Sequence, residues 1–272
     1  MGYENLALRY KGYLPAGSPK AVLIVLHGLA EHYGRYMNVV DYFVPRGYAV
    51  YGFDQRGHGQ SEGLRGYVEK FSYYTEDLKT FFDMVRVDHS SEKVFLIGHS
   101  VGGTIALAYC INYQNEVDGL ILSGATIKPG NSLSPTKILL ARLLSLIMPK
   151  MAVDVIDASA ISQDQAVVDA YIHDSLVYRG KIRARLGVEL LKIMQELPNQ
   201  MSETRLPILI MSGSTDRLSN PEGSQILYDC ISSRDKTLKF YDGLYHEIFN
   251  EPGRDQVFND MDNWLATCLQ MG

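Results

Sequence analysis

Three residues that can together activate a hydroxyl group occur along the chain in the order serine, aspartate, histidine. Ser100 is the central residue of the pentapeptide Gly-His-Ser-Val-Gly, and Asp216 and His246 follow it. A serine hydroxyl is a poor nucleophile at neutral pH. It becomes reactive when a histidine takes its proton and a carboxylate orients that histidine. The order serine, acid, histidine therefore predicts nucleophilic attack on an acyl group.

The pentapeptide lies where a strand pattern changes into a helix pattern. The apolar run Val94–Ile97 precedes it, and an alanine-rich stretch follows it up to Tyr109. A nucleophile elbow requires this context, with the serine on a strained turn at the top of a parallel sheet. Glycines two residues before and two residues after the serine leave room for strand and helix to approach each other. An ordinary glycine turn that happens to contain a serine is the alternative.

The base and the acid are chosen by their positions relative to predicted strands. Beyond the helix that follows Ser100 there are only two histidines, and His173 falls in a segment that we interpret as a cap. His246 follows the last predicted strand, and a surface histidine is its alternative role. Asp216 follows an earlier strand, which places it on the same edge of the sheet. Asp242 is the rival acid, and capping the next helix is the alternative role of Asp216.

Attack on a carbonyl group leaves negative charge on its oxygen, which two preset backbone N–H donors must stabilise. We predict that Val101, the residue after the nucleophile, supplies one donor. Leu29 supplies the other from the loop after the first central strand, where Gly28 lets the backbone pass close to Ser100. A plain strand-to-helix turn is the alternative for this loop.

The composition excludes several classes of protein. The chain has 272 residues, of which 46% are hydrophobic and 21% are charged, and its net charge is −5. These values indicate a globular protein, and they argue against nucleic acid as a partner. The three cysteines are far apart without metal-ligand spacing, which favours a reducing compartment. With no pattern for a leader, a lipid anchor or a membrane span, we expect a cytoplasmic protein.

Strand and helix patterns alternate along most of the chain, which predicts an α/β fold with a mostly parallel sheet and helices on both faces. The predicted strands are residues 6–14, 21–26, 48–53, 94–97, 119–123, 207–212 and 237–241. The predicted helices include residues 35–45, 71–89, 221–231 and 255–269.

The alternation breaks between residues 125 and 186, where we predict helices and no strand. A structureless insertion of this length is improbable, so we predict a helical cap inserted into a core of residues 1–124 and 187–272. The stretch Lys137–Met148 is too apolar for an ordinary surface helix. It is predicted to pack on the core, and a role in lining an acyl tunnel or entering a lipid interface is compatible with that packing.

The glycine-rich segment 53–61 could be mistaken for a phosphate-binding loop. It lacks both the lysine of a P-loop and the glycine spacing of a dinucleotide-binding loop. We therefore predict a structural role for it near the site.

Several of these segments resemble the monoglyceride lipases of the α/β-hydrolase superfamily. The matching segments are residues 27–36, 54–61, 98–103, 169–176, 213–218 and 245–247, in the same order. The resemblance implies an α/β-hydrolase fold and hydrolysis of a single acyl chain from glycerol, with no cofactor and no metal. It also implies that Glu31, Arg35, His99 and Tyr171 bind the glycerol hydroxyls. Salt bridges within the loop and core hydrogen bonds are the alternative roles of these four residues.

The chain departs from the family pattern in two places. Val101 stands where methionine is usual, and the first edge strand of the family is missing, so a different edge is open to a partner chain. We predict a serine carboxylic ester hydrolase acting on monoacylglycerols or similar single-chain esters. Lysophospholipase, thioesterase and acyltransferase activities use the same triad and stay open. A ligand sensor and a peripheral membrane protein that docks through the cap also stay open as alternatives. The oligomeric state stays open too.

Overall fold

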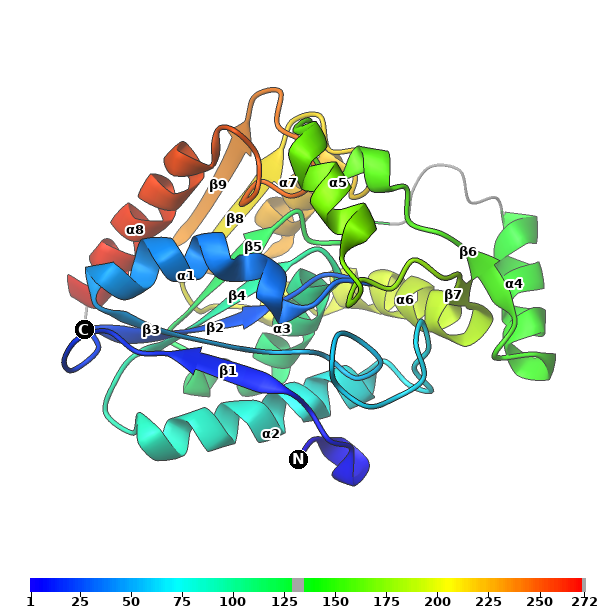
Figure 1. Cartoon of the computed structure of the whole chain (residues 1–272), viewed down its shortest axis with the longest axis horizontal. Helices are drawn as coiled ribbons and strands as arrows, with labels where there is room; N and C mark the ends of the chain where they lie inside the picture. Colours follow the sequence, from blue (N-terminus) through cyan, green and yellow to red (C-terminus); the bar gives the residue numbers. More distant parts are fainter. Residues whose placement is uncertain (129–134, 271–272) are drawn as a thin grey trace.

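A seven-stranded sheet forms the centre of the computed structural model, which describes residues 1–128 and 135–270. The strand order is β1-β3-β2-β4-β5-β8-β9; β1 is antiparallel to β3, and every other pair is parallel (Figure 1). The strands are β1 Tyr10–Tyr13, β2 Ala21–Leu26, β3 Tyr48–Phe53, β4 Val94–His99, β5 Gly119–Ser123, β8 Ile208–Gly213 and β9 Lys236–Tyr241. The mostly parallel sheet predicted from the sequence is confirmed.

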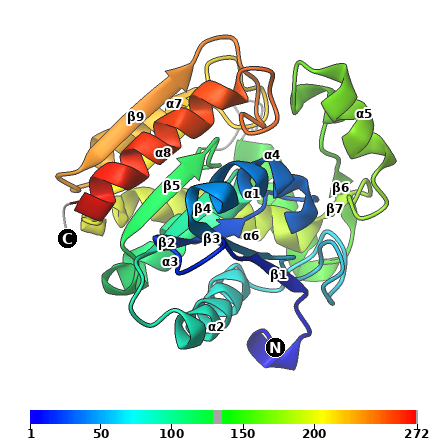
Figure 2. The ribbon, with the colours of Figure 1, turned by 60° about the vertical axis from the view of Figure 1, so that its left-hand side comes forward.

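Helices cover both faces of this sheet (Figure 2). The helices α1 (Met37–Phe43) and α8 (Arg254–Gln270) lie on one face. The other face carries α2 (Ser72–Asp88), α3 (Val101–Tyr113) and α7 (Pro221–Cys230). Because both faces are covered, every residue of the five strands from β3 to β8 in the sheet order is buried.

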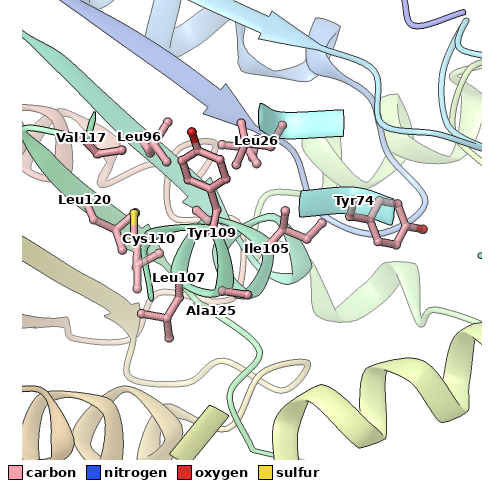
Figure 3. Close-up of a cluster of buried hydrophobic side chains, with 14 of the residues drawn as sticks. Leu26, Tyr74, Leu96, Ile105, Leu107, Tyr109, Cys110, Val117, Leu120 and Ala125 are labelled. Atoms are coloured by element: carbon pink, nitrogen blue, oxygen red, sulfur yellow. The ribbon is translucent and has the colours of Figure 1, made fainter. Parts of the chain in front are cut away.

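Side chains of β2 alternate between the two faces, as the period of a strand requires. Ala21, Leu23 and Val25 pack toward α1 and α8. Leu26, the last residue of β2, packs on the other face beside Tyr109 of α3, in the cluster that Figure 3 shows. The helix that follows Ser100 is therefore held against the sheet by a large apolar contact.

The segment between β5 and β8, which we call the cap after the prediction made for it, contains strands as well as helices. Its elements are α4 (Pro135–Ile147), β6 (Ala152–Asp154), α5 (Gln165–His173), β7 (Ile182–Arg183) and α6 (Ala184–Glu196). The prediction of no strand in this segment is wrong, because β6 and β7 form a short antiparallel ribbon. Strands of two and three residues are too short to give a readable alternation. Figure 1 shows α4, β6 and β7 at the end of the molecule opposite the C-terminus.

Backbone hydrogen bonds join the cap to the core. The Tyr178 N–H donates to the Ala30 carbonyl at 2.7 Å, and the Glu247 N–H donates to the Ile161 carbonyl at 2.8 Å. The predicted border between residues 186 and 187 falls within α6, and residues 129–134 of the predicted cap lie outside the described residues. The division into core and inserted cap stays a prediction.

Candidate active site

Ser100 occupies a strained turn between β4 and α3. Its backbone angles are φ 53° and ψ −122°, a conformation that costs a non-glycine residue about 1–3 kcal/mol. The Ser100 N–H donates to the Ser123 carbonyl at 2.9 Å, and the Ser100 carbonyl accepts from the Gly103 N–H at 3.0 Å. These bonds hold the turn, which has the form expected of a nucleophile elbow.

The two glycines that flank Ser100 permit this close packing. A Cβ atom on Gly98 would lie 2.6 Å from the Cα of Gly103. A Cβ atom on Gly102 would lie 2.4 Å from the carbonyl oxygens of Leu26 and His27. Since all these neighbours are backbone atoms that cannot swing away, both positions require glycine.

His246 and Asp216 are hydrogen-bonded to each other in the interior of the protein. The His246 Nδ1 lies 2.7 Å from Asp216 Oδ2, and both side chains are buried. The other carboxylate oxygen of Asp216 accepts from the N–H groups of Leu218 at 2.8 Å and Ser219 at 2.9 Å. Asp216 is therefore fixed by its own loop and directs the remaining ring nitrogen of His246, Nε2, away from itself.

The alternatives to these two residues are placed elsewhere. Asp242 is exposed and accepts a hydrogen bond from the Ser214 hydroxyl at 3.3 Å. The cap of α7 is Asn220 rather than Asp216. His173 lies in α5, where its Nδ1 hydrogen-bonds to a backbone carbonyl of the same helix at 2.8 Å. The structure thus brings to His246 the acid that the sequence favoured.

The surroundings of His246 favour its protonated form. Burial lowers the pKa of His246, but the charge and hydrogen bond of Asp216, with the charges of Glu247 and Glu31, raise that pKa above its ordinary value. The ring of His99 lies 4.5 Å from the ring of His246. Burial and the charge of His246 hold the pKa of His99 well below its ordinary value. His246 can thus carry a proton while its neighbour His99 stays neutral.

Ser100 and His246 line one cavity of about 540 Å³. The end of β5 brings them together. Gly124 follows Ser123, which binds the Ser100 N–H, and a Cβ atom on Gly124 would lie 3.2 Å from His246 Nδ1. Among the described residues, the Ser100 Oγ hydrogen-bonds to the Thr126 Oγ1 at 3.3 Å and not to His246. Hydrogen bonds of catalytic groups often form fully only with substrate present.

Two backbone N–H groups beside Ser100 are free to bind an oxyanion. Within residues 1–128 and 135–270, the N–H groups of Leu29 and Val101 have no hydrogen-bond partner, and both residues line the cavity. The neighbouring Gly28 N–H is engaged by Glu31 Oε1 at 2.6 Å. A Cβ atom on Gly28 would lie 3.1 Å from the Cβ of Ser100, so the loop passes close to the nucleophile.

His27 fixes the conformation of this loop. Its Nε2 accepts from the Gln55 N–H at 2.9 Å, so its Nδ1 carries the proton and donates to the Gly28 carbonyl at 2.7 Å. Burial lowers the pKa of His27 to about 4, which keeps the ring neutral. None of residues 53–61, which supply Gln55, lines the cavity, in agreement with the structural role predicted for that segment.

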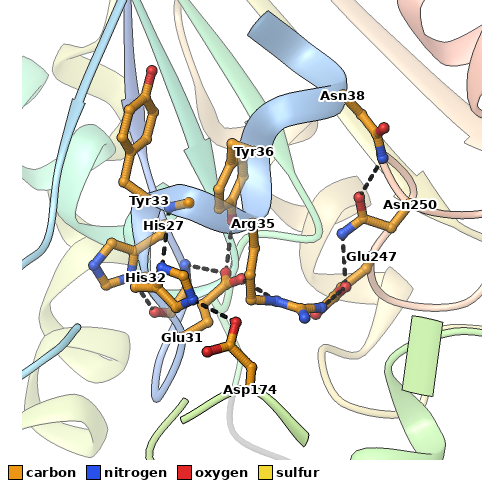
Figure 4. Close-up of polar contacts among 12 residues, drawn as sticks. His27, Glu31, His32, Tyr33, Arg35, Tyr36, Asn38, Asp174, Glu247 and Asn250 are labelled. Carbon is orange, nitrogen blue, oxygen red and sulfur yellow. Dashed lines mark hydrogen bonds and ion pairs between the residues drawn. The ribbon is translucent and has the colours of Figure 1, made fainter. Parts of the chain in front are cut away.

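Glu31 and Arg35 bind each other and the surrounding loop (Figure 4). The Glu31 Oε1 also accepts from the Tyr36 hydroxyl at 2.6 Å, and its Oε2 lies 3.2 Å from Arg35 Nε. The Arg35 Nη2 lies 2.6 Å from Glu247 Oε2. Glu31 and Glu247 are thus both paired with the guanidinium of Arg35. The pair of Glu31 with Arg35 matches their alternative role, a salt bridge within the loop.

His99 and Tyr171 offer polar atoms that are still free. Both line the cavity, and the Tyr171 ring lies 4.8 Å below the guanidinium carbon of Arg35. The His99 Nδ1 is hydrogen-bonded to the Ser123 Oγ at 3.1 Å. In the part of the chain that the structure describes, His99 Nε2 and the Tyr171 hydroxyl have no hydrogen-bond partner. These two atoms can bind hydroxyl groups of a substrate.

The rest of the cavity is mostly apolar and belongs to the cap. Its apolar lining from α4, β6, β7 and α6 comprises Leu140, Ala141, Leu144, Val153, Ile182, Ala184, Val188, Leu190, Leu191 and Met194. The helix α4 also has an outer face with exposed leucines and isoleucine, at Leu139, Leu143, Leu146 and Ile147. One helix therefore lines the cavity and presents apolar side chains to the outside.

Three polar residues of the site were missed in the sequence. Glu247 pairs with Arg35. Its position next to His246 is the signal that could have indicated a role in the site. Thr126 and Ser219 line the cavity beside Ser100, and their hydroxyl oxygens lie 3.0 Å apart. No motif marks these two hydroxyls, because only the folded chain brings them to the nucleophile.

Comparison with known proteins places the chain in a family. The family model described as serine aminopeptidase, S33 matches residues 17–253. The monoacylglycerol lipase of Mycolicibacterium smegmatis is 36% identical over 268 residues, which cover 98% of this chain and 96% of the relative. The chain belongs to the monoglyceride lipase-like α/β-hydrolases. The human monoglyceride lipase is 33% identical to this hydrolase, over 97% of this chain and 87% of its own length.

Solved structures agree with this hydrolase in fold. The monoacylglycerol lipase of Paleococcus ferrophilus has a TM-score of 0.87 at 28% identity, covering 96% of this chain and 99% of its own. A soluble variant of the Saccharomyces cerevisiae monoglyceride lipase, in complex with a substrate analogue, has a TM-score of 0.89 at 25% identity over 98% and 94% of the two chains. The predicted fold class and family are confirmed. No helix within the described ranges has the length and apolar content to cross a bilayer.

Proposed function

We propose that this protein is a carboxylic ester hydrolase that cleaves monoacylglycerols through an acyl-enzyme on Ser100. The 2.7 Å pairing of His246 with Asp216, on the cavity that Ser100 lines, carries the proposal. It supplies a base that is held in one orientation and a nucleophile that reaches the same space. The family's monoglyceride lipases support an ester of glycerol as the substrate.

In the first half of the reaction, His246 Nε2 takes the proton of the Ser100 hydroxyl. The Ser100 oxygen forms a bond to the ester carbon, and the carbonyl electron pair moves to the carbonyl oxygen. We assign Leu29 and Val101 as the N–H donors to that oxyanion, since both groups are free. The oxyanion then re-forms the carbonyl group, and the bond between the ester carbon and the glycerol oxygen breaks. His246 gives its proton to the glycerol oxygen, and the acyl group stays on Ser100.

In the second half, water replaces glycerol. His246 takes a proton from the water molecule, and the resulting hydroxide attacks the acyl carbon. The bond to Ser100 breaks, His246 returns a proton to the Ser100 oxygen, and the fatty acid leaves. Asp216 stays ionised throughout and stabilises the imidazolium form of His246 in both halves.

The charges around the cavity favour a neutral head group over a phosphate. Within the described part of the chain, the lining cation Lys128 is already paired with Glu222 at 2.7 Å, and Arg35 is held between two carboxylates. A lysophospholipid would bring its phosphate near Glu31 and Glu247 without a free cation to meet it. We assign His99 and Tyr171 as contacts to the glycerol hydroxyls. Glu31 and Arg35 then act at the glycerol end mainly through the loop that they hold.

The two faces of α4 suggest how an apolar ester reaches the cavity. Leu140 and Leu144 line the cavity, and Leu140 is also exposed, as are Leu139, Leu143 and Leu146. Apolar area buried in a lipid interface contributes about 25 cal/mol per Å². We propose that the exposed leucines enter a lipid surface, so that a monoacylglycerol passes along the same helix into the cavity.

Initial rates on a panel of esters test the proposed activity. We expect the order monoacylglycerols above diacylglycerols, and long-chain p-nitrophenyl esters above the acetate. Lysophosphatidylcholine and acyl-thioesters of the same chain length should react more slowly than the monoacylglycerol. A faster rate on the lysophospholipid, or no hydrolysis of any ester, would contradict the proposal.

Liposome flotation tests the membrane contact apart from catalysis. The Ser100→Ala protein should float with neutral vesicles of phosphatidylcholine, and the triple variant Leu139→Gln, Leu143→Gln, Leu146→Gln in the same background should not. A variant with three glutamines on an exposed face of another helix, at Val87, Asp83 and Thr80 of α2, is the matched control. If the α4 variant floated with the vesicles as the α2 control variant does, docking through α4 would be contradicted.

A further inference from the structure

We propose that Thr126 is a further catalytic residue, whose hydroxyl donates a hydrogen bond to the Ser100 oxygen during the reaction. This inference rests on the proposed function of Ser100 as the nucleophile. Thr126 lies after β5, outside every motif of the sequence, and it lines the cavity. Its Oγ1 lies 3.3 Å from the Ser100 Oγ.

A second hydroxyl extends this contact. The Ser219 Oγ lies 3.0 Å from the Thr126 Oγ1, and the Ser219 N–H donates to Asp216 Oδ1 at 2.9 Å. The hydroxyl groups of Ser219, Thr126 and Ser100 are therefore connected by two successive hydrogen bonds, and we call these three groups the hydroxyl row. The row begins on the loop of the proposed acid and ends at the proposed nucleophile.

The chemistry of the base fixes the direction of these hydrogen bonds. The Ser100 hydroxyl has one proton, and it must point toward His246 Nε2 when the base removes it. Thr126 must then donate to the Ser100 oxygen, and Ser219 must donate to the Thr126 oxygen. Hydrogen bonds that run in one direction polarise one another, so the distal Ser219 strengthens the bond at the nucleophile.

The backbone holds the Thr126 hydroxyl in place. The Thr126 N–H donates to the Ser100 carbonyl at 3.2 Å, and the Thr126 carbonyl accepts from the Thr104 hydroxyl at 2.8 Å. Thr104 belongs to the helix that begins at the elbow. With its backbone held and its Oγ1 already in contact with Ser100 and Ser219, Thr126 needs little reorganisation when charge develops on Ser100, which is the condition for effective electrostatic stabilisation.

Thr126 acts at two points of the reaction without losing its own proton. As His246 removes the proton of Ser100, the Ser100 oxygen gains negative character before its bond to the acyl carbon is complete. As the acyl-enzyme breaks down, the same oxygen leaves with the electron pair of that bond and then receives a proton from His246. In both steps a donor at Thr126 stabilises the charge on the oxygen.

The substitution Thr126→Val removes the hydroxyl and keeps the branched shape of the side chain. The rate of phosphonylation of Ser100 by a fluorophosphonate should fall by about tenfold, the value of one hydrogen bond to a partly charged oxygen. In that reaction the Ser100 oxygen bonds to phosphorus, fluoride leaves, and His246 takes the proton. Thr126→Ser should restore most of the lost rate. The pH midpoint of the reaction should not move, because His246 and Asp216 are untouched.

A double-mutant cycle with Ser219→Ala tests the row itself. Ser219→Ala alone should slow phosphonylation by about threefold, and the double variant should be no slower than Thr126→Val, because the effect of Ser219 passes through Thr126. Equal melting temperatures exclude a loss of folding. Phosphonylation of Thr126→Val at the wild-type rate or faster, or fully additive losses in the cycle, would overturn the inference. A wild-type protein that does not react with the probe would instead contradict the proposed function.

Discussion

The ring of His246 and the carboxylate of Asp216 meet at 2.7 Å although 30 residues separate them, and both are buried. The loops after β8 and β9 bring them together, since the carboxyl ends of neighbouring parallel strands share one edge of the sheet.

Replacing Asp216 with asparagine should leave the protein folded and nearly inactive. An amide would present its NH₂ group to His246 Nδ1 or reverse the ring tautomer, and a loss of about 10³- to 10⁴-fold in kcat is expected. Steady-state rates on a p-nitrophenyl ester measure the loss. Asp242→Asn, which changes the rival carboxylate next to the same loop, should keep the wild-type rate. Equal losses in the two variants would count against Asp216 as the acid.

The rate should depend on pH through the protonation of His246. The base works only when neutral, and Asp216 raises the pKa of His246 above its ordinary value of about 6.5. The value of kcat/KM should therefore fall as the pH drops, with a midpoint above 6.5 rather than below it. A pH–rate profile from 5 to 9 measures the midpoint. A rate that stays constant through this range would rule out a histidine base.

Filling the cavity at Gly187 should change the preference for chain length. Gly187 lines the cavity from α6, and a Cβ atom there would have no neighbour within 4 Å. In Gly187→Phe the ring should displace about three methylene groups of a long acyl chain, at about 0.8 kcal/mol each. The value of kcat/KM should then fall by about 50-fold for long-chain esters and much less for the acetate.

The matched control for this variant adds the same ring elsewhere. Val87→Phe places it on the exposed surface of α2 and should leave both rates unchanged. If Gly187→Phe slowed acetate and long-chain esters equally, the acyl chain would not occupy this part of the cavity.

Removing the Tyr171 hydroxyl should affect only substrates that contain glycerol. The hydroxyl is free in the described structure, and one neutral hydrogen bond contributes about 1 kcal/mol. In Tyr171→Phe the KM for a monoacylglycerol should rise by about fivefold, while kcat/KM for a p-nitrophenyl ester stays the same. An equal loss on both esters would mean that Tyr171 acts by packing under Arg35 rather than by binding glycerol.

The sequence predicted the buried parallel strands almost residue by residue, because such strands are continuous apolar runs. The strand predicted over residues 6–14 is shorter in the structure, where β1 covers only Tyr10–Tyr13. The predicted strands 21–26, 48–53 and 119–123 coincide with β2, β3 and β5. The helix predicted over residues 35–45 is confirmed, as α1 flanked by 3₁₀ turns over Tyr33–Tyr36 and Val44–Arg46. The 3₁₀ type of the two turns was not predicted, because the spacing of apolar residues does not distinguish helix types.

The site was predictable where a motif marks it and not where only the fold creates it. The pentapeptide marks Ser100, and the strand ends mark Asp216 and His246. The internal pairing of Glu31 with Arg35 depends on side-chain geometry within one loop. The short ribbon of the cap and the hydroxyl of Thr126 leave no periodic or spaced signal in the chain.

The position at which a fluorophosphonate attaches to the wild-type protein shows directly whether Ser100 is the nucleophile. We predict one phosphonyl group per chain, on the peptide that contains Ser100, with loss of ester hydrolysis in proportion to labelling. Ser100→Ala should take up no label and hydrolyse no ester, and its melting temperature should stay near that of the wild type. Labelling of a different residue, together with ester hydrolysis that survives in Ser100→Ala, would show that Ser100 is not the nucleophile.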